Sequence, residues 1–208
     1  MTGGELARPH VFEPGADLRS GRTLLLLHGT GADEFDLLNL GKAIDPEANL
    51  LSPRGLVDEN GMNRFFIRYP DGSFDEESIK KNVNELAAFV REASVHYGFN
   101  LEKVVAVGFS NGANTAGALL QLHPEVVSTI AAFGTTKAFA VSPTTPDLRG
   151  KKVFIANGEI DPYSPAEKTS QLIDEFEGFG AEVTLLMHPG GHQISPEHVQ
   201  FISAALRA

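Results

Sequence analysis

One turn near the middle of the chain restricts the fold more than any other segment. Residues 104–112 read VVAVGFSNG, so a β-branched apolar run passes directly into Gly-x-Ser-x-Gly, and the helix-compatible segment 111–123 follows. Gly108 and Gly112 carry no Cβ, which permits the strand and the helix beside Ser110 to approach closely at a sharp turn. This context predicts an elbow that presents the Ser110 hydroxyl above the edge of a sheet. The alternative is a glycine-rich turn without a chemical role.

Apolar runs of strand length alternate with amphipathic segments along the rest of the chain. Besides the strand before Ser110, the pattern predicts strands at 22–27, 49–52, 126–133, 151–157 and 182–187. It predicts helices at 35–44, 75–97, 111–123, 165–179 and 196–206. Within a leader at 1–20, residues 10–13 are predicted to form a short edge strand. The alternation predicts a single α/β domain over residues 1–208, with a mostly parallel sheet flanked by helices.

Ser110 needs a base, and a group that orients the base, because a serine hydroxyl is weakly nucleophilic at neutral pH. Downstream, Asp161 and His192 each follow the end of a predicted strand. The carboxyl ends of parallel strands form the edge at which open α/β sheets place their chemistry. The order Ser110, Asp161, His192 is typical of α/β-hydrolases and differs from the orders in trypsin-like and subtilisin-like proteases. These three residues are the predicted catalytic triad.

Each partner of Ser110 has an alternative nearby. Glu159 lies in the same turn as Asp161, but Asp161 is followed by a proline, which stiffens the loop that holds its carboxylate. His188 stands at the end of its strand, whereas two glycines provide a flexible turn before His192. His188 and His192 also have H-x-x-x-H spacing, but the Pro-Gly-Gly between them excludes a regular helix. No metal site is therefore predicted.

A second glycine-rich turn follows the first long apolar strand, where RTLLLL at 22–27 leads into HGTGAD. The phosphate-binding patterns GxxxxGK[ST] and GxGxxG are absent, so no nucleotide cofactor is predicted. Acyl transfer requires two backbone N–H groups directed at an oxyanion. One belongs to the residue after the nucleophile, Asn111, which also begins a helix whose positive dipole end points there. The other is assigned to Thr30, between two glycines, with an inert glycine turn as the alternative.

The composition restricts the partners and the compartment. The formal net charge of −10 argues against nucleic acids and anionic membranes as partners. The chain contains no Cys, which excludes disulfides, a Cys nucleophile and thiolate metal sites, and fits a reducing compartment. The leader lacks the apolar stretch of a signal peptide, and the longest apolar runs have the length of strands rather than of a membrane span. We therefore expect a cytoplasmic protein without membrane insertion.

Several motifs carry a resemblance to a known family: LLLLHGTGADE, LLSPRG, GMNRFF, VVAVGFSNGAN, ANGEIDP and HPGGH. Together they resemble the small phospholipase/carboxylesterase group of the α/β-hydrolases. This group is related to the acyl-protein thioesterases and is similar to the hydroquinone-stress-associated esterases of bacteria. The resemblance runs through nearly the whole chain from Arg22. It implies a cap-less α/β-hydrolase fold that needs no cofactor and hydrolyses carboxylic esters or thioesters. Some members of the group are dimers, so the resemblance allows a homodimer.

Carried over onto this sequence, the family's triad falls on Ser110, Asp161 and His192, and its oxyanion amides fall on Thr30 and Asn111. Asn111 stands where the thioesterase relatives usually have Gln. The expected function is a serine esterase for a small-molecule ester, with thioester and lysophospholipid hydrolysis as related activities. A ligand-binding or sensing protein without turnover and a cofactor-free perhydrolase or C–C hydrolase are alternatives on the same scaffold. A dinucleotide-binding oxidoreductase is the alternative from the fold class alone.

Two loops bear on the substrate. Residues 134–150 lie where many hydrolases insert a helical cap and are too few for one, so we expect an open pocket. Residues 53–74 are predicted as a long irregular stretch with Arg54, Arg64 and Arg68. Arg54 or Arg64 is expected to meet a polar or carboxylate end of the substrate. The apolar residues of this stretch, which either fix it to the core or form an acyl- or aryl-binding wall, are Met62, Phe65, Phe66, Ile67 and Tyr69.

Overall fold

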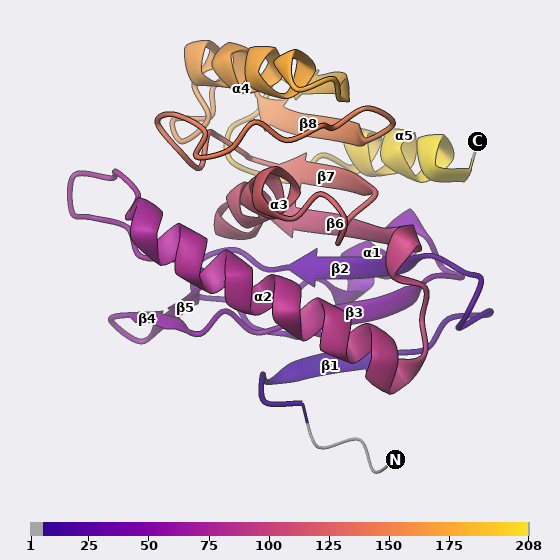
Figure 1. Ribbon diagram of the computed structural model, residues 1–208. Helices are drawn as coiled ribbons and strands as arrows, with labels where there is room; N and C mark the ends of the chain where they lie inside the picture. The colour runs from indigo at the N-terminus through magenta and orange to yellow at the C-terminus, as the bar shows by residue number, and fades with distance from the viewer. Residues whose placement is uncertain (1–5, 208) are drawn as a thin grey trace.

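A seven-stranded sheet forms the centre of the molecule (Figure 1), and the computed structural model describes residues 6–207. The strands of this sheet are β1 (His10–Glu13), β2 (Thr23–Leu27), β3 (Asn49–Pro53), β6 (Val104–Phe109), β7 (Thr129–Phe133), β8 (Lys152–Gly158) and β9 (Glu182–His188). They lie in the order β1-β3-β2-β6-β7-β8-β9. The edge strand β1 pairs antiparallel with β3, and the other neighbours pair parallel.

Helices cover both faces of the sheet (Figure 1). One face carries α1 (Leu38–Ile44) and α5 (Pro196–Arg207), and the other carries α2 (Glu76–Tyr97), α3 (Asn111–Leu122) and α4 (Ala166–Gly178). A short 3-10 helix at Leu101–Lys103 precedes β6. The predicted α/β class, with a mostly parallel sheet flanked by helices, is confirmed.

The leucines of β2 show how the sequence produces two cores. Leu25 and Leu27 are buried with the helices α2, α3 and α4, whereas Leu24 and Leu26 are buried with α1 and α5. Successive side chains of a strand point to opposite faces, so an uninterrupted apolar run supplies both cores at once. A continuous run of this kind is what a central strand covered on both faces requires.

The topology brings the ends of β2 and β6 together at a switch point. After β2 the chain passes through α1 to β3 on one side, and later returns through α2 to β6 on the other side of β2. Open α/β sheets bind ligands at the carboxyl ends of strands where the strand order reverses. Thr30 follows β2 and Ser110 follows β6. The fold therefore places these two turns next to each other.

The prediction that the stretch 53–74 is irregular is wrong for its central part. It contains an antiparallel hairpin of β4 (Val57–Glu59) and β5 (Met62–Arg64). The turn between these strands is Asn60-Gly61, and both residues have positive φ, at 56° and 83°. A two-residue Asn-Gly turn with positive φ at both positions matches the right-handed twist of the flanking strands. That dipeptide was the signal for the hairpin.

The largest differences at element boundaries lie at the starts of one helix and one strand. The helix predicted at 35–44 begins at Leu38, because the preceding residues form a turn in which the Asp33 carboxylate accepts a hydrogen bond from Phe35 N at 3.0 Å. The strand predicted at 126–133 begins at Thr129, because Val126 N donates to His123 O in a turn after α3. Residues 134–151 contain neither helix nor strand, and no cap domain is built there.

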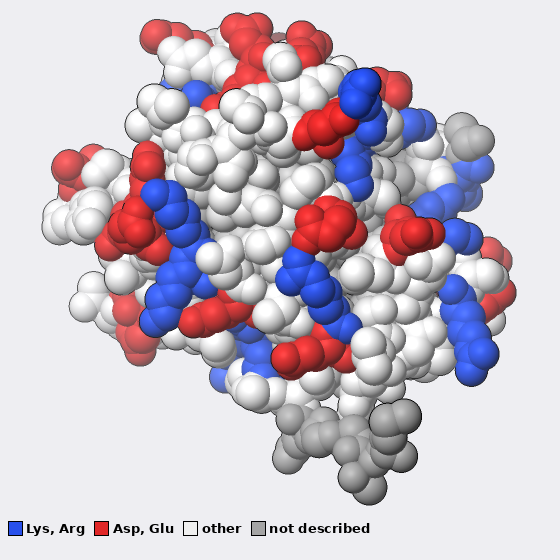
Figure 2. Space-filling view, viewed as in Figure 1, with Lys and Arg blue, Asp and Glu red and all other residues white. Residues whose placement is uncertain are grey.

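Basic and acidic side chains lie side by side on the face that carries α2 (Figure 2). Lys80 pairs with Glu77, and Arg91 pairs with Glu125. In each pair the carboxylate neutralises the positive charge of its basic partner. Between residues 6 and 207, no helix is at once long enough and apolar enough to cross a membrane.

Candidate active site

Ser110 sits on the predicted elbow between β6 and α3. Its backbone has φ 55° and ψ −115°, and its N–H donates to Phe133 O at 2.9 Å. A Cβ added to Gly112 would lie 1.9 Å from Leu27 O, and one added to Gly108 would lie 2.4 Å from Gly112 O. The glycines are therefore required by the contact between strand and helix. A side chain at positive φ with this ψ costs about 1–3 kcal/mol, a strain that the surrounding hydrogen bonds maintain.

Asp161 and His192 form a hydrogen-bonded pair although they are 31 residues apart. His192 Nδ1 donates to Asp161 Oδ2 at 2.7 Å, and Tyr163 N donates to the other carboxylate oxygen at 2.8 Å. The Asp161 side chain is 0% exposed and that of His192 is 19% exposed. A buried carboxylate on Nδ1 holds the imidazole in the tautomer that leaves Nε2 free to accept a proton.

Ser110 and His192 line the same pocket. Within the described residues, no hydrogen bond joins the Ser110 hydroxyl to the imidazole. Such bonds are often long in enzymes without substrate and tighten only when substrate binds. The structure thus joins two of the three predicted triad residues directly and places the third in the same cavity.

Three residues fix the ring of His192. Its centroid lies 5.0 Å from that of Phe109 and 4.9 Å from that of Tyr163. Gly134, with φ 63°, passes so close that an added Cβ would lie 2.8 Å from His192 Cε1. The imidazole is therefore held between two aromatic rings and a backbone that leaves no room for a side chain.

The alternative residues lie elsewhere. His188 is buried, its Nδ1 accepts a hydrogen bond from Gly190 N at 3.0 Å, and its ring packs edge-on against His198 at 5.2 Å. Glu159 is exposed to solvent. His188 is therefore a packed core residue, and the carboxylate that contacts an imidazole in this turn belongs to Asp161. Over residues 6–207, no group of three or more His, Cys, Asp or Glu side chains is placed to hold a metal ion.

Thr30 and Asn111 line the same pocket as Ser110 and His192. The neighbouring amides are already used, since Gly31 N donates to Asn63 O and Ser110 N donates to Phe133 O, each at 2.9 Å. In the part of the chain that the structure describes, the backbone N–H groups of Thr30 and Asn111 have no acceptor. Asn111 is the first residue of α3, so the positive end of that helix dipole adds to the same region. Two unused amides beside a helix start can bind an anionic oxygen.

The pocket has a volume of about 1190 Å³. Its wall combines apolar and charged side chains, among them Met62, Phe74, Phe139, Tyr163, Arg64, Arg68, Lys137 and Lys168. Of the apolar residues predicted at 53–74, Met62 lies on this wall, whereas Phe65 and Phe66 belong to the core beneath α2. Part of the stretch therefore fixes it to the core, and the predicted acyl- or aryl-binding role stays a prediction for Met62.

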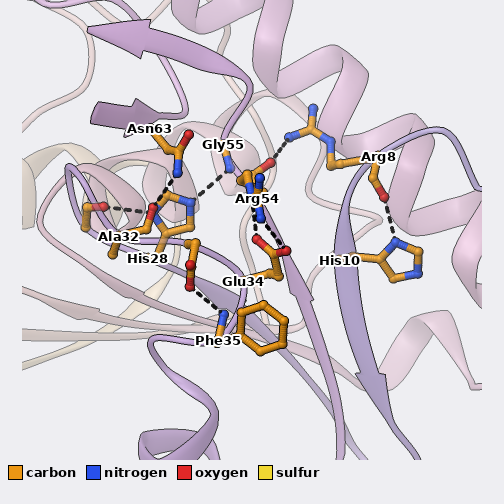
Figure 3. A network of polar contacts seen from close by, with 11 residues as sticks. Arg8, His10, His28, Ala32, Glu34, Phe35, Arg54, Gly55 and Asn63 are labelled. Carbon is orange, nitrogen blue, oxygen red and sulfur yellow. Dashed lines mark hydrogen bonds and ion pairs between the residues drawn. The ribbon is translucent and has the colours of Figure 1, made fainter. Parts of the chain in front are cut away.

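The structure does not support Arg54 as the arginine that meets a polar end of the substrate. Arg54 does not line the pocket but forms a two-pronged ion pair with the Glu34 carboxylate, in which its Nη2 lies 2.6 Å from Oε1 (Figure 3). The Glu34 side chain is 8% exposed, so the pair is fixed against the protein surface. A planar guanidinium matches a carboxylate in this geometry. Of the two candidates Arg54 and Arg64, only Arg64 lines the pocket.

Sequence reasoning did not assign a role to His28. This buried residue accepts a hydrogen bond from Gly55 N at Nε2, at 2.9 Å, and its Nδ1 therefore carries the proton donated to Gly29 O at 2.7 Å (Figure 3). Burial lowers the pKa of His28, which favours the neutral ring that this bonding requires. His28 ties the turn after β2 to the segment after β3. Its place directly after a buried strand was the available signal.

Known proteins resemble this chain in both sequence and fold. The sequence pattern of the phospholipase/carboxylesterase family matches residues 10–208. MhqD of Bacillus subtilis (strain 168) is 40% identical over 195 residues, which cover 92% of this chain and 94% of MhqD. The structure of the Bacillus cereus carboxylesterase is 38% identical with a TM-score of 0.92, and covers 97% of this chain and 94% of that one.

A carboxylesterase from Mesorhizobium loti is 32% identical with a TM-score of 0.89, over 98% of this chain and 96% of that one. The family and these neighbours indicate an esterase-type hydrolase. The chain belongs to the phospholipase/carboxylesterase family, whose fold it shares from its edge strand to its last helix.

Proposed function

We propose that this protein cleaves carboxylic esters through a covalent acyl-enzyme on Ser110. One observation carries the proposal: a buried Asp161–His192 pair faces the pocket in which the strained elbow presents Ser110. The unused amides of Thr30 and Asn111 lie on the same pocket and provide the electrophilic part of the site.

In the first step, His192 Nε2 takes the hydroxyl proton while Ser110 Oγ attacks the ester carbonyl carbon. The carbonyl oxygen becomes an oxyanion that the N–H groups of Thr30 and Asn111 stabilise. Asp161 stabilises the imidazolium without accepting its proton. His192 then gives the proton to the alkoxide as the carbon–oxygen bond breaks, and the alcohol leaves.

In the second step, His192 takes a proton from water, which attacks the acyl-enzyme carbonyl. The same two amides stabilise the second oxyanion. Collapse of this intermediate breaks the bond to Ser110, whose oxygen regains the proton from His192, and releases the acid. Substrate and water supply every atom exchanged.

The pocket supports an acyl or aryl ester as the substrate. Met62, Phe74 and Phe139 provide apolar surface for such a group, and the missing cap leaves the mouth open to solvent. Thioesters and lysophospholipids present the same carbonyl and are further candidates within this chemistry. We also propose a cytoplasmic location, in line with the cysteine-free composition.

The test is a fluorophosphonate probe followed by mass spectrometry, together with p-nitrophenyl esters and acyl-CoA thioesters of graded chain length. We expect one adduct per chain on Ser110 and turnover of at least one ester series. A stoichiometric adduct without turnover would favour the ligand-binding alternative. Turnover without an adduct on Ser110 would contradict the proposed nucleophile.

The packing around His192 makes Gly134→Ala a sharp probe of the site. The new Cβ would displace the imidazole, and a displacement of about 1 Å can lower turnover by ~10²-fold. We expect a loss of kcat for p-nitrophenyl acetate of this size, with a melting temperature lowered by the strain of a side chain at positive φ.

Gly150→Ala provides the matched control. Gly150 also has positive φ, at 79°, but a Cβ there would meet no atom within 4 Å. The Gly150→Ala substitution therefore introduces backbone strain similar to that of Gly134→Ala without contacting His192. Equal losses of kcat in the two variants would show that strain alone, rather than the contact with the imidazole, is responsible.

A further inference from the structure

One short segment contacts the turns that carry both oxyanion amides. At the end of β5, Asn63 O accepts the hydrogen bond of Gly31 N at 2.9 Å. The Asn63 side chain donates to Ala32 O at 2.9 Å (Figure 3). The next residue, Arg64, donates from Nη1 to the Thr30 hydroxyl at 2.6 Å. Three successive residues of the turn after β2 are thus fixed from the same segment.

The same segment also holds the second donor. Phe65 N donates to Asn111 Oδ1 at 2.7 Å, across 46 residues of sequence. Both residues are 2% exposed, so this bond is shielded from water. Asn63, Arg64 and Phe65 therefore connect the turn after β2 with the start of α3. This bridge holds the N–H groups of Thr30 and Asn111 at a fixed distance from each other, although Thr30 follows β2 and Asn111 begins α3.

Arg64 is itself held rigidly. Its side chain is 3% exposed, its Nε donates to Phe66 O at 3.1 Å, and its Cζ lies 5.6 Å from the centre of the Phe66 ring. Glu59 is its counter-ion at 3.2 Å, but the same carboxylate oxygen lies 3.3 Å from Arg68. Arg64 Nη1 contacts both Glu59 and the Thr30 hydroxyl. Because one carboxylate is shared by two guanidinium groups, the cluster of Arg64, Arg68 and Glu59 carries a net positive charge.

We propose that Arg64 is a positioning residue of the oxyanion site, which orients the Thr30 amide through the Thr30 hydroxyl and adds positive charge beside it. This inference rests on the proposed acyl-enzyme function. Glycines on both sides of Thr30 leave its peptide free to rotate unless something fixes it. An oxyanion site stabilises the transition state only when its donors are already aimed before the reaction.

The expected signature is a loss of kcat at nearly constant KM, because the oxyanion exists only after attack. Arg64→Met keeps the length of the side chain and removes its donors and charge. We expect kcat for p-nitrophenyl acetate to fall about tenfold or more, below the ~10²–10³-fold loss of a direct donor. Arg64→Lys, which restores one donor and the charge, should recover part of this loss.

Thr30→Val tests the contact between Arg64 and the Thr30 hydroxyl from the other side. It removes the hydroxyl that accepts from Arg64 but keeps the backbone N–H. If Arg64 acts through Thr30, Thr30→Val lowers kcat, and the double variant loses less than the product of the two single losses. A trifluoromethyl ketone, which forms a tetrahedral oxyanion with the enzyme, should bind more weakly by about the factor lost in kcat.

Arg54→Met is the matched control, since it makes the same substitution in the same loop, away from the pocket. It should keep kcat within about twofold of wild type. A wild-type protein without esterase activity would overturn the proposed function itself. An active wild type with unchanged kcat in Arg64→Met and Thr30→Val would overturn the role of Arg64 alone. If Arg64→Met fails to fold, Thr30→Val and Arg64→Lys decide the question in the same way.

Discussion

Ser110→Ala should lower the turnover of p-nitrophenyl acetate by at least ~10³-fold while the protein stays folded. The exchange removes the attacking oxygen, and what remains is the contribution of substrate binding and the oxyanion amides. Steady-state kcat and fluorophosphonate labelling measure the effect together. Near-wild-type turnover in this variant would mean that another residue is the nucleophile.

A second exchange at this position separates chemistry from backbone strain. Ser110→Gly removes the same hydroxyl and also tolerates the φ of 55° found at this residue. Ser110→Gly should be as inactive as Ser110→Ala. It should melt at a higher temperature than Ser110→Ala, because it relieves the strain of a side chain at positive φ. A lower melting temperature in Ser110→Gly would show that the elbow stores no appreciable strain.

Asp161→Asn is the second exchange for which we expect a large loss, ~10⁴-fold in kcat. An amide cannot stabilise the imidazolium, and its NH₂ group opposite Nδ1 favours the tautomer in which Nε2 carries the proton. That tautomer cannot act as the base for Ser110. The measurement is kcat/KM for an activated ester, with circular dichroism to confirm the fold.

Glu159→Gln is the matched control for Asp161→Asn. Glu159 is an exposed carboxylate in the same turn. Its exchange changes the net charge by the same amount without touching His192, so turnover should stay at the wild-type level. If Glu159→Gln lost activity and Asp161→Asn kept it, Glu159 rather than Asp161 would be the carboxylate that orients His192.

The stretch 53–74 contains a hairpin that the prediction of an irregular stretch misses. Its local signal is the Asn60-Gly61 dipeptide, which favours a two-residue hairpin turn. With that turn, the period of two along β5 places Met62 and Arg64 on one face, and both indeed line the pocket.

Features that depend on neighbouring residues follow from the amino-acid sequence alone. The apolar runs dictate strands buried on both faces, and the glycines around Ser110 dictate the elbow, because periodicity and steric limits act within a few residues. Pairings between residues far apart in the chain are visible only in the folded molecule. Arg54 pairs with Glu34, Arg64 donates to the Thr30 hydroxyl, and Phe65 N donates to Asn111 Oδ1. These choices follow from strand register and loop path, which no short stretch of sequence contains.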